Sequence, residues 1–326
     1  MTPMLVEAAP GFVGVFGLPF MLRALVAIAL LAVAAAIVGV FINFRELEFV
    51  SDGLVHAVFP GLVVGSIAGG TAGLLPGAVA AAVLAALLFT LLGRSGSPRS
   101  GGVGSRDAGI AVVLTGLFSL GVVLVSRSES YVSQLQELLF GRILTVTGAQ
   151  LWQIAVVACV AIGIILVTRR AQLFRAFDPA GFRAVGFSEF RTDLALNIAV
   201  ALLVVAGVQA LGVLMVVAIL VVPVAVARLL TRRLWLLAPV AALVTLVAGA
   251  AGLWGSFEWS LRGSVSASPG AMIVLALVAL YGVAVAGSLA ARALGGARDR
   301  RTAARALAES PGPTDSSARQ RTGACA

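Results

Sequence analysis

The only histidine of the chain, His56, follows Asp52 by four residues, and this pair is the best candidate in the sequence for metal chemistry. Residues four apart lie on one face of a helix. Pro60 continues that face. Because proline has no N–H, it leaves the carbonyl of His56 without its helical partner and is expected to kink the helix. A carboxylate, an imidazole and a free carbonyl together resemble a transient site for a divalent cation. The alternative is structural: Asp52 caps a helix and His56 is a buried, hydrogen-bonded histidine.

Two ligands from one chain do not complete a metal site, which needs about four. A second copy of the chain, or other acids, must supply the rest. Glu258 is an additional metal candidate, because it lies at the predicted outer end of an apolar segment, where it can meet an incoming cation. A solvated loop acid is the alternative for Glu258. One histidine and scattered acids form no catalytic cluster, so no catalytic residue is assigned and an enzyme is not expected.

The elements that must position these residues are long apolar helices. Of the 326 residues, 60% are hydrophobic and 11% are charged, and the mean hydropathy is +1.07. Continuous apolar runs of about 20 residues are typical of transmembrane helices, whereas a β-barrel alternates polar and apolar residues. We therefore expect an all-α, polytopic transmembrane bundle of about eight to nine helices. The apolar segments lie at 20–43, 52–70, 73–93, 107–126, 150–168, 193–211, 212–230, 233–254 and 269–291.

Two of these segments, 193–211 and 212–230, are barely long enough to cross a bilayer. The break between them falls at Gln209 to Gly212. The two segments are therefore either full spans or short helices buried in protein.

Arginine supplies all the basic side chains, since the sequence contains no lysine, and the net charge is +9. The arginines cluster at the ends of apolar segments, so they indicate membrane topology rather than nucleic-acid binding. With the N-terminus outside, 19 arginines lie on the cytoplasmic side. Four lie on the other side or at its helix ends: Arg23, Arg127, Arg142 and Arg262. This distribution predicts a cytoplasmic C-terminus.

Three regions follow from this topology. Residues 1–19 form a short extracytoplasmic segment without the basic start of a signal peptide. Residues 20–292 form the transmembrane domain. Residues 293–326 form a basic cytoplasmic tail with no apolar period, which is expected to be disordered and to favour anionic lipid headgroups.

Small residues mark a surface for close helix packing. Gly61, Gly65 and Gly69 repeat every four residues after Ala57. Such a stripe lets a neighbouring helix approach closely in a membrane. We expect a structural role for it rather than a role in a pore.

The segment 177–187 is expected to form a short cytoplasmic helix. Asp178 is a natural N-cap, Pro179 fits the first helical position and Gly186 fits the C-terminal cap, with Gly181 and Arg183 between them. A capped, partly apolar surface helix can insert into a groove of another protein, although ordinary loops also contain single helical turns. Without lysine the chain has no G-x-x-x-x-G-K-[ST] phosphate loop, so ATP hydrolysis that drives it takes place on a different polypeptide.

At this point the chain resembles the manganese/zinc/iron permease subunits of bacterial ABC importers, over about residues 18–287. Residues 51–61 are similar to the family's Gly-Asp-x-x-x-His-Ala segment, which is often followed by x-x-Pro-Gly. Residues 139–147 resemble its Leu-Phe-Gly-(Asp)-Ile-Leu segment, with Arg142 in place of the usual acid. Residues 177–187 match the position of the loop that docks on the ATPase.

A fourth motif, at 212–227, resembles the family's Gly-x-Leu-Leu-Val-x-x-Leu-Leu-x-x-Pro-Ala-x-x-Ala run. Pro223 matches the proline of that run and is expected to take part in helix packing or to kink its helix. Any one of these motifs is loose. The four in this order are specific for the family.

The resemblance implies a transport subunit with its permease domain at 20–292, in the bacterial plasma (inner) membrane. The implied partners are a second permease protomer of the same or a different sequence, two cytoplasmic ATPase subunits that bind ATP, and an extracytoplasmic metal-binding protein. No permanently bound cofactor is implied; the transported substrate is manganese, zinc or iron. Asp52 and His56 match positions of the metal pathway in the family. The residues that fall in its docking loop are Asp178, Pro179, Gly181, Arg183 and Gly186.

Two other functions are compatible with the same apolar pattern. One is an ABC permease for siderophores or corrinoids, which needs a wider passage and no metal ligands. The other is an ion-coupled secondary carrier, which needs no ATPase. The sparse intramembrane charge counts against a carrier with a proton relay.

Overall fold

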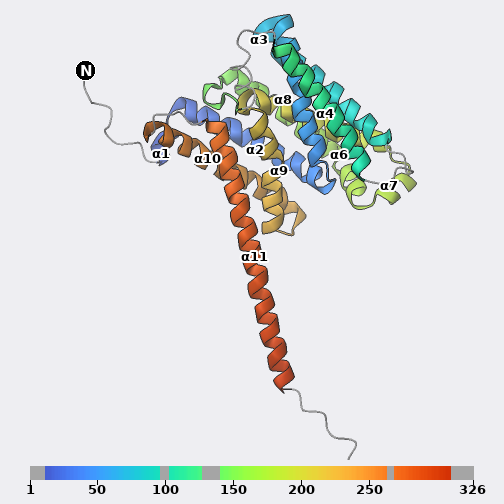
Figure 1. The fold of residues 1–326 in the computed structure, drawn as a ribbon, viewed down its shortest axis with the longest axis vertical. Coiled ribbons are helices and arrows are strands. Elements are labelled where there is room, and N and C mark those ends of the chain that lie inside the picture. Colours follow the sequence, from blue (N-terminus) through green and yellow to red (C-terminus); the bar gives the residue numbers. More distant parts are fainter. Residues whose placement is uncertain (1–11, 96–102, 127–139, 263–267, 310–326) are drawn as a thin grey trace, which may run out of the picture. The chain divides into compact units, whose positions relative to one another are not determined.

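The computed structural model describes residues 12–95, 103–126, 140–262 and 268–309. Within these ranges every regular element is a helix, which confirms the all-α prediction. The helices are α1 (Phe12–Val15), α2 (Pro19–Phe44), α3 (Glu48–Ser95), α4 (Val103–Val125), η1 (Ile143–Thr145), α6 (Gly148–Phe177), α7 (Pro179–Ala184), α8 (Glu189–Leu211), α9 (Val213–Leu230), α10 (Leu234–Arg262) and α11 (Pro269–Glu309) (Figure 1).

Nine helical stretches in the described part of the chain are long and apolar enough to cross a membrane. They match the nine predicted segments in order, although α6 continues past the predicted end at 168. Their bounds are Pro19–Phe44, Glu48–Gly70, Ala72–Gly93, Ala108–Val125, Gly148–Phe177, Glu189–Leu211, Val213–Leu230, Leu234–Leu261 and Pro269–Arg292.

The predicted segments 193–211 and 212–230 form two helices that are each long enough to cross a membrane, α8 and α9. α8 has 23 residues and α9 has 18, so at 1.5 Å per residue even α9 is about 27 Å long. Only Gly212 separates them, with φ 81° and ψ 163°, a conformation that is essentially restricted to glycine. Gly141 lies against this break: a Cβ on Gly141 would lie 2.3 Å from the carbonyl carbon of Leu211.

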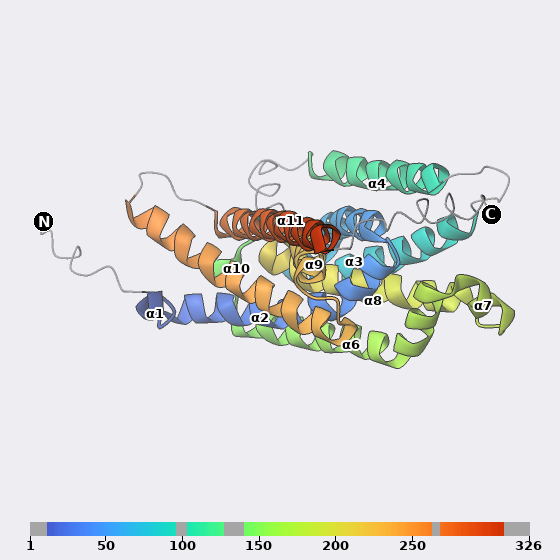
Figure 2. The ribbon, with the colours of Figure 1, turned by 90° about the horizontal axis from the view of Figure 1, so that it is seen from below.

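α8 is the most buried of the membrane-length helices in the described bundle, with 72% of its most apolar window inside the protein. It packs against α2, α3, α6 and α9, and Figure 2 shows α2 and α6 running beside it. Its side chains are apolar nearly all round, as expected of a helix without a solvent face. The buried Asn197 donates a hydrogen bond to Thr90 Oγ1 of α3 (2.9 Å), which gives the amide a partner inside the bundle.

α3 is a helical hairpin. Its backbone leaves the helical conformation at Gly69 and Gly70, where Gly70 has φ 56° and ψ −138°. The two arms pack through glycines: a Cβ on Gly65 would lie 2.3 Å from the carbonyl oxygen of Gly73, and a Cβ on Gly61 would lie 2.5 Å from that of Gly77. The predicted close packing is therefore confirmed for Gly61 and Gly65.

The structure corrects that prediction for Gly69. A Cβ on Gly69 would meet nothing within 4 Å, so this glycine allows the chain to reverse and does not pack against a helix. The non-helical break in α3 falls at Gly69 and Gly70, and Pro60 lies inside the first helical arm. Two adjacent glycines adopt the necessary dihedral angles at low energy. Pro223 likewise lies inside α9, buried, and the helix continues to Leu230.

The end of the chain also differs from the expectation. α11 continues as a helix to Glu309, which corrects the disorder expected for residues 293–309. The extension is rich in Ala, Arg and Leu, which favour the helix even without an apolar period. A second compact unit begins at Val283, inside α11. Residues 1–11 and 310–326 of the two predicted terminal regions lie outside the described residues.

Candidate metal site and docking surface

Asp52 and His56 lie on the first arm of α3, about one and two turns after its start at Glu48. They share one face, as the spacing predicts, and His56 Nε2 lies 3.7 Å from Asp52 Oδ1. The side chains of His56 and Asp52 are 25% and 37% exposed, respectively. Two ligand atoms each about 2.1 Å from one ion, at angles of about 90–109°, lie roughly 3.0–3.4 Å apart. A small adjustment therefore lets both side chains bind the same cation.

Phe118 of α4, a helix that packs along α3, contacts the imidazole of His56. The rings of His56 and Phe118 meet edge to face, with centroids 5.3 Å apart and an interplanar angle of 82°, and Phe118 packs on Phe59 at 5.8 Å. Asp52 lies inside the helix and does not cap it. In the structural alternative Asp52 is a cap and His56 is buried and hydrogen-bonded, whereas Asp52 lies inside α3 and the His56 side chain is 25% exposed.

The structure does not bring Glu258 to this pair. Glu258 lies near the end of α10, a helix that packs against α2 and α9. Among the described residues, no three His, Cys, Asp or Glu side chains are arranged to hold a metal ion. In the described part of one copy, Asp52 and His56 therefore remain the two candidate ligands that lie together.

The short helix predicted at 177–187 is present as α7. Asp178 Oδ1 accepts a hydrogen bond from the N–H of Gly181 (2.8 Å), and Gly186 has φ +84° after the helix. A Cβ at Gly181 would lie 2.1 Å from Asp178 Oδ2, so a larger residue there would require the carboxylate to shift. The cap chemistry that the sequence predicts is thus confirmed, including Pro179 at the first helical position.

Aromatic packing fixes α7 to the end of α6. The buried Phe182 stacks on Phe187 at 5.1 Å and meets Phe174 edge to face at 5.6 Å. Phe177, Val185 and Phe187 leave apolar surface exposed around the helix, at 62%, 67% and 51%. Exposed apolar side chains on a small rigid helix are typical of a surface that binds another protein.

Replacing Asp178 with Ala is expected to destabilise α7 by about 0.5–2 kcal/mol, because the N–H of Gly181 loses its cap. Hydrogen exchange of the amides of residues 180–184 measures the effect, and these amides should exchange faster in the variant. Asp178→Asn is the matched control, because an amide oxygen can also cap. Equal exchange rates in Asp178→Ala and the wild type would contradict the assigned cap.

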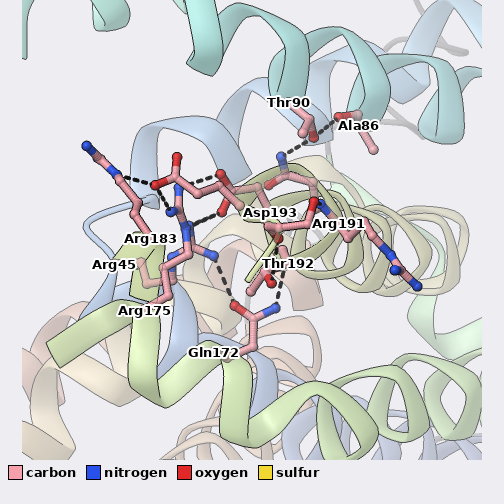
Figure 3. Close-up of polar contacts among 12 residues, drawn as sticks. Arg45, Ala86, Thr90, Gln172, Arg175, Arg183, Arg191, Thr192 and Asp193 are labelled. Carbon is pink, nitrogen blue, oxygen red and sulfur yellow. Dashed lines mark hydrogen bonds and ion pairs between the residues drawn. The ribbon is translucent and has the colours of Figure 1, made fainter. Parts of the chain in front are cut away.

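A network of ion pairs connects this region to the start of α3 (Figure 3). Asp193 of α8 pairs with Arg45, which lies between α2 and α3, and with Arg175 of α6 at 2.7 Å. Glu189 of α8 pairs with Arg175 at 2.9 Å and with Arg183 of α7. The side chain of Arg45 is only 8% exposed, so little water competes for its contact with Asp193, whereas Arg183 at the other end of the network is 69% exposed.

Gln172 adds a hydrogen-bonded connection. Its side-chain oxygen accepts from Arg45 Nη1 (2.9 Å) and its amide donates to the carbonyl of Thr192 (2.8 Å). Sequence reasoning assigned no role to Gln172, Glu189 or Asp193. The only available signal was the presence of acidic residues beside arginines at the predicted cytoplasmic segment ends.

The described helices define a polytopic helical membrane protein with a short capped helix, α7, outside the membrane-length helices. The model of one family, described as the ABC 3 transport family, matches residues 17–288. The chain belongs to this family. It is therefore the membrane permease subunit of an ABC transport system and not an enzyme.

Individual relatives are similar over most of their length. The manganese transport system membrane protein MntC of Listeria monocytogenes serovar 1/2a is 26% identical, over 82% of this chain and 91% of the relative. The chelated iron transport system membrane protein YfeD of Yersinia pestis is 28% identical, over 74% of this chain and 79% of the relative. The solved structure of PsaBC from Streptococcus pneumoniae in complex with Fab shares the fold, with a TM-score of 0.71, 23% identity, and coverage of 84% of this chain and 94% of that chain.

Proposed function

We propose that the chain is the permease of an ATP-driven importer of a divalent metal ion: manganese, iron or zinc. The observation that carries this proposal is the pair of Asp52 and His56, which present a carboxylate and an imidazole 3.7 Å apart on one helix face. These donor types suit first-row divalent metals. The similarity to relatives named for manganese and chelated iron favours those two metals as substrates.

We infer that the N-terminus is outside and the C-terminus is cytoplasmic in the plasma membrane. The arginine distribution supports this orientation. Exposed tryptophans support the positions of the membrane boundaries: Trp152 near the start of α6 and Trp259 near the end of α10 belong to the outer boundary, and Trp235 at the start of α10 belongs to the inner one. In this orientation α7 and the start of α3 are both on the cytoplasmic side.

A second permease protomer, identical or different in sequence, completes the metal site. Since the described part of one copy offers two ligands, two copies that face each other across the pathway provide about the four that a divalent ion needs. Intramembrane acids and histidines of this kind lie on substrate pathways, because an unpaired charge in hydrocarbon is costly.

Two cytoplasmic ATPase subunits bind the exposed apolar surface around α7 and provide the ATP site. An extracytoplasmic binding protein delivers the metal on the opposite side, where Glu258 lies in the proposed orientation. ATP-driven closure of the ATPase subunits then moves the helices between outward-open and inward-open states. In this cycle the cation is bound by Asp52 and His56 and released toward the cytoplasm.

The test is metal accumulation by cells that contain the whole transporter, compared with cells that lack this chain. Manganese, iron and zinc are supplied separately, and the purified complex is examined for ATPase subunits. We expect ATP-dependent accumulation of one metal and an ATPase that co-purifies in a fixed ratio. A chain that purifies without any ATPase would favour the ion-coupled carrier. Uptake of a siderophore or corrinoid in place of the free ion would favour the other permease class.

A further inference from the structure

We infer that Asp193 is the positioning residue that transmits movement of α7 to α3, the helix that carries Asp52 and His56. This inference rests on the proposed function, in which an ATPase moves α7. Asp193 contacts neither the docking surface nor the candidate metal ligands. It acts through the two arginines that it pairs with, Arg45 and Arg175.

The path from α7 to Asp193 consists of charged contacts. Arg183, on α7, pairs with Glu189, and Glu189 also pairs with Arg175 at 2.9 Å. Arg175 then donates two hydrogen bonds to Asp193, from Nε at 2.8 Å and from Nη2 at 2.7 Å. A bidentate arginine–carboxylate pair fixes direction as well as distance. A displacement of α7 is therefore passed to the carboxylate of Asp193.

The path continues from Asp193 to the start of α3. Arg45 donates to Asp193 and caps the end of α2, and only Glu46 and Leu47 separate it from α3. Two hydrogen bonds make this corner rigid: Leu47 N–H to the carbonyl of Ile42 (3.0 Å) and Asn43 Nδ2 to Glu48 (2.9 Å). Asp52 lies about one turn further along α3, so a shift of Arg45 moves the metal ligands.

The ion pairs lie beside a hollow between the two ends that they connect. A hollow of about 320 Å³ is lined from the α2–α3 corner and from the α6–α7 end by Phe44, Arg45, Glu46, Arg175, Ala176, Pro179 and Arg183. An aromatic contact between Phe44 of α2 and Phe177 at the end of α6, with ring centroids 5.7 Å apart, also joins the two sides. The shared carboxylate of Asp193 connects Arg45 on one side with Arg175 on the other. Glu46, exposed at the edge of this corner, has φ 52°, a strained conformation for a non-glycine residue and typical of a functional position.

The chain also provides a matched control. Arg191 lies on α8, two residues before Asp193, and Figure 3 shows its side chain directed away from the network. It is exposed. Changing Arg191 alters the charge of the same helix end without touching the proposed path.

The experiment compares Asp193→Asn, Asp193→Glu and Arg191→Gln in the complete transporter with its ATPase subunits and binding protein. We expect Asp193→Asn to assemble and to hydrolyse ATP at the basal rate. Metal uptake, and the stimulation of ATP hydrolysis by the metal-loaded binding protein, should fall about tenfold or more, because a partly buried ion pair has lost its charge on one side. Asp193→Glu retains the charge and should recover most of the uptake, and Arg191→Gln should stay within about twofold of the wild type.

Hydrogen exchange provides a readout independent of the cargo. In the wild type, addition of ATP should change the exchange of amides 48–56, and this change should be absent in Asp193→Asn and present in Arg191→Gln. No ATP-dependent change in the wild type, or an unaltered change in Asp193→Asn, overturns the inference. Loss of assembly or of basal hydrolysis in Asp193→Asn also overturns it, since the residue would then be only structural. A wild-type transporter that accumulates no metal contradicts the proposed function and leaves the exchange test valid.

Discussion

His56→Ala and Asp52→Ala are each expected to abolish accumulation of the transported metal while the transporter still assembles. Each variant removes one of the two side chains that the proposed metal site uses in each copy. Replacing a residue that only hydrogen-bonds to a metal ligand typically lowers metal affinity about 10–100-fold. Loss of a ligand should therefore lower uptake about 100-fold or more at limiting metal concentration. Neither side chain is fully buried, so its removal should leave the packing of α3 intact.

The measurement is the metal content of cells supplied with manganese, iron or zinc in turn, together with the yield of purified complex. Ser66→Ala is the matched control, because Ser66 lies on the same helix arm and bonds only to its own helix, at the carbonyl of Val63. Unchanged accumulation of every metal in both ligand variants would refute the role of the pair. Loss of one metal alone would identify the substrate.

If Asp52→Ala leaves metal uptake unchanged, a second conclusion follows. The permease fold does not depend on this residue, so the chain would remain an ABC permease. A passage for a siderophore or corrinoid would then become the better interpretation, because such substrates need no metal ligands. The two ligand variants thus distinguish a metal pathway from a wider one.

Much of the architecture follows from local chemistry and could be predicted. Continuous apolar runs located all nine membrane-length helices of the described residues. The four-residue spacing placed Asp52 and His56 on one face, and the sequence Asp178-Pro179 located α7 because caps depend on neighbouring residues. Each of these features involves residues within about one or two helical turns of each other.

The features that could not be predicted depend on distant parts of the chain. Arg45 and Asp193 are 148 residues apart and Arg45 and Gln172 are 127 residues apart, so no local pattern reveals the network. The four-residue spacing of Gly61, Gly65 and Gly69 predicted close helix packing. It did not show that the packing partner is the second arm of α3 itself. That information lies in Gly73 and Gly77, which approach only after the chain reverses at Gly69 and Gly70.

Gly65→Leu is expected to prevent stable folding of the α3 hairpin. The Cβ position of Gly65 lies 2.3 Å from the carbonyl oxygen of Gly73, and 3.1 Å from the Cα of Gly77. Backbone atoms cannot rotate away as a side chain can, so the arms must separate. Overpacking alone costs about 1–3 kcal/mol, and separation of the arms adds lost contacts. We therefore expect destabilisation of about 3 kcal/mol or more, measured as lower thermal stability and lower yield in detergent.

Gly116→Leu is the matched control. Gly116 is also a glycine within a membrane-length helix, α4, but a Cβ there would meet nothing within 4 Å. Leucine favours the helix more than glycine does, so this variant should be as stable as the wild type or slightly more stable. Equal stability of the two variants would contradict the close packing of the hairpin arms. Because the first arm carries Asp52 and His56, milder changes at Gly65 should reduce metal uptake in proportion to the displacement of that arm.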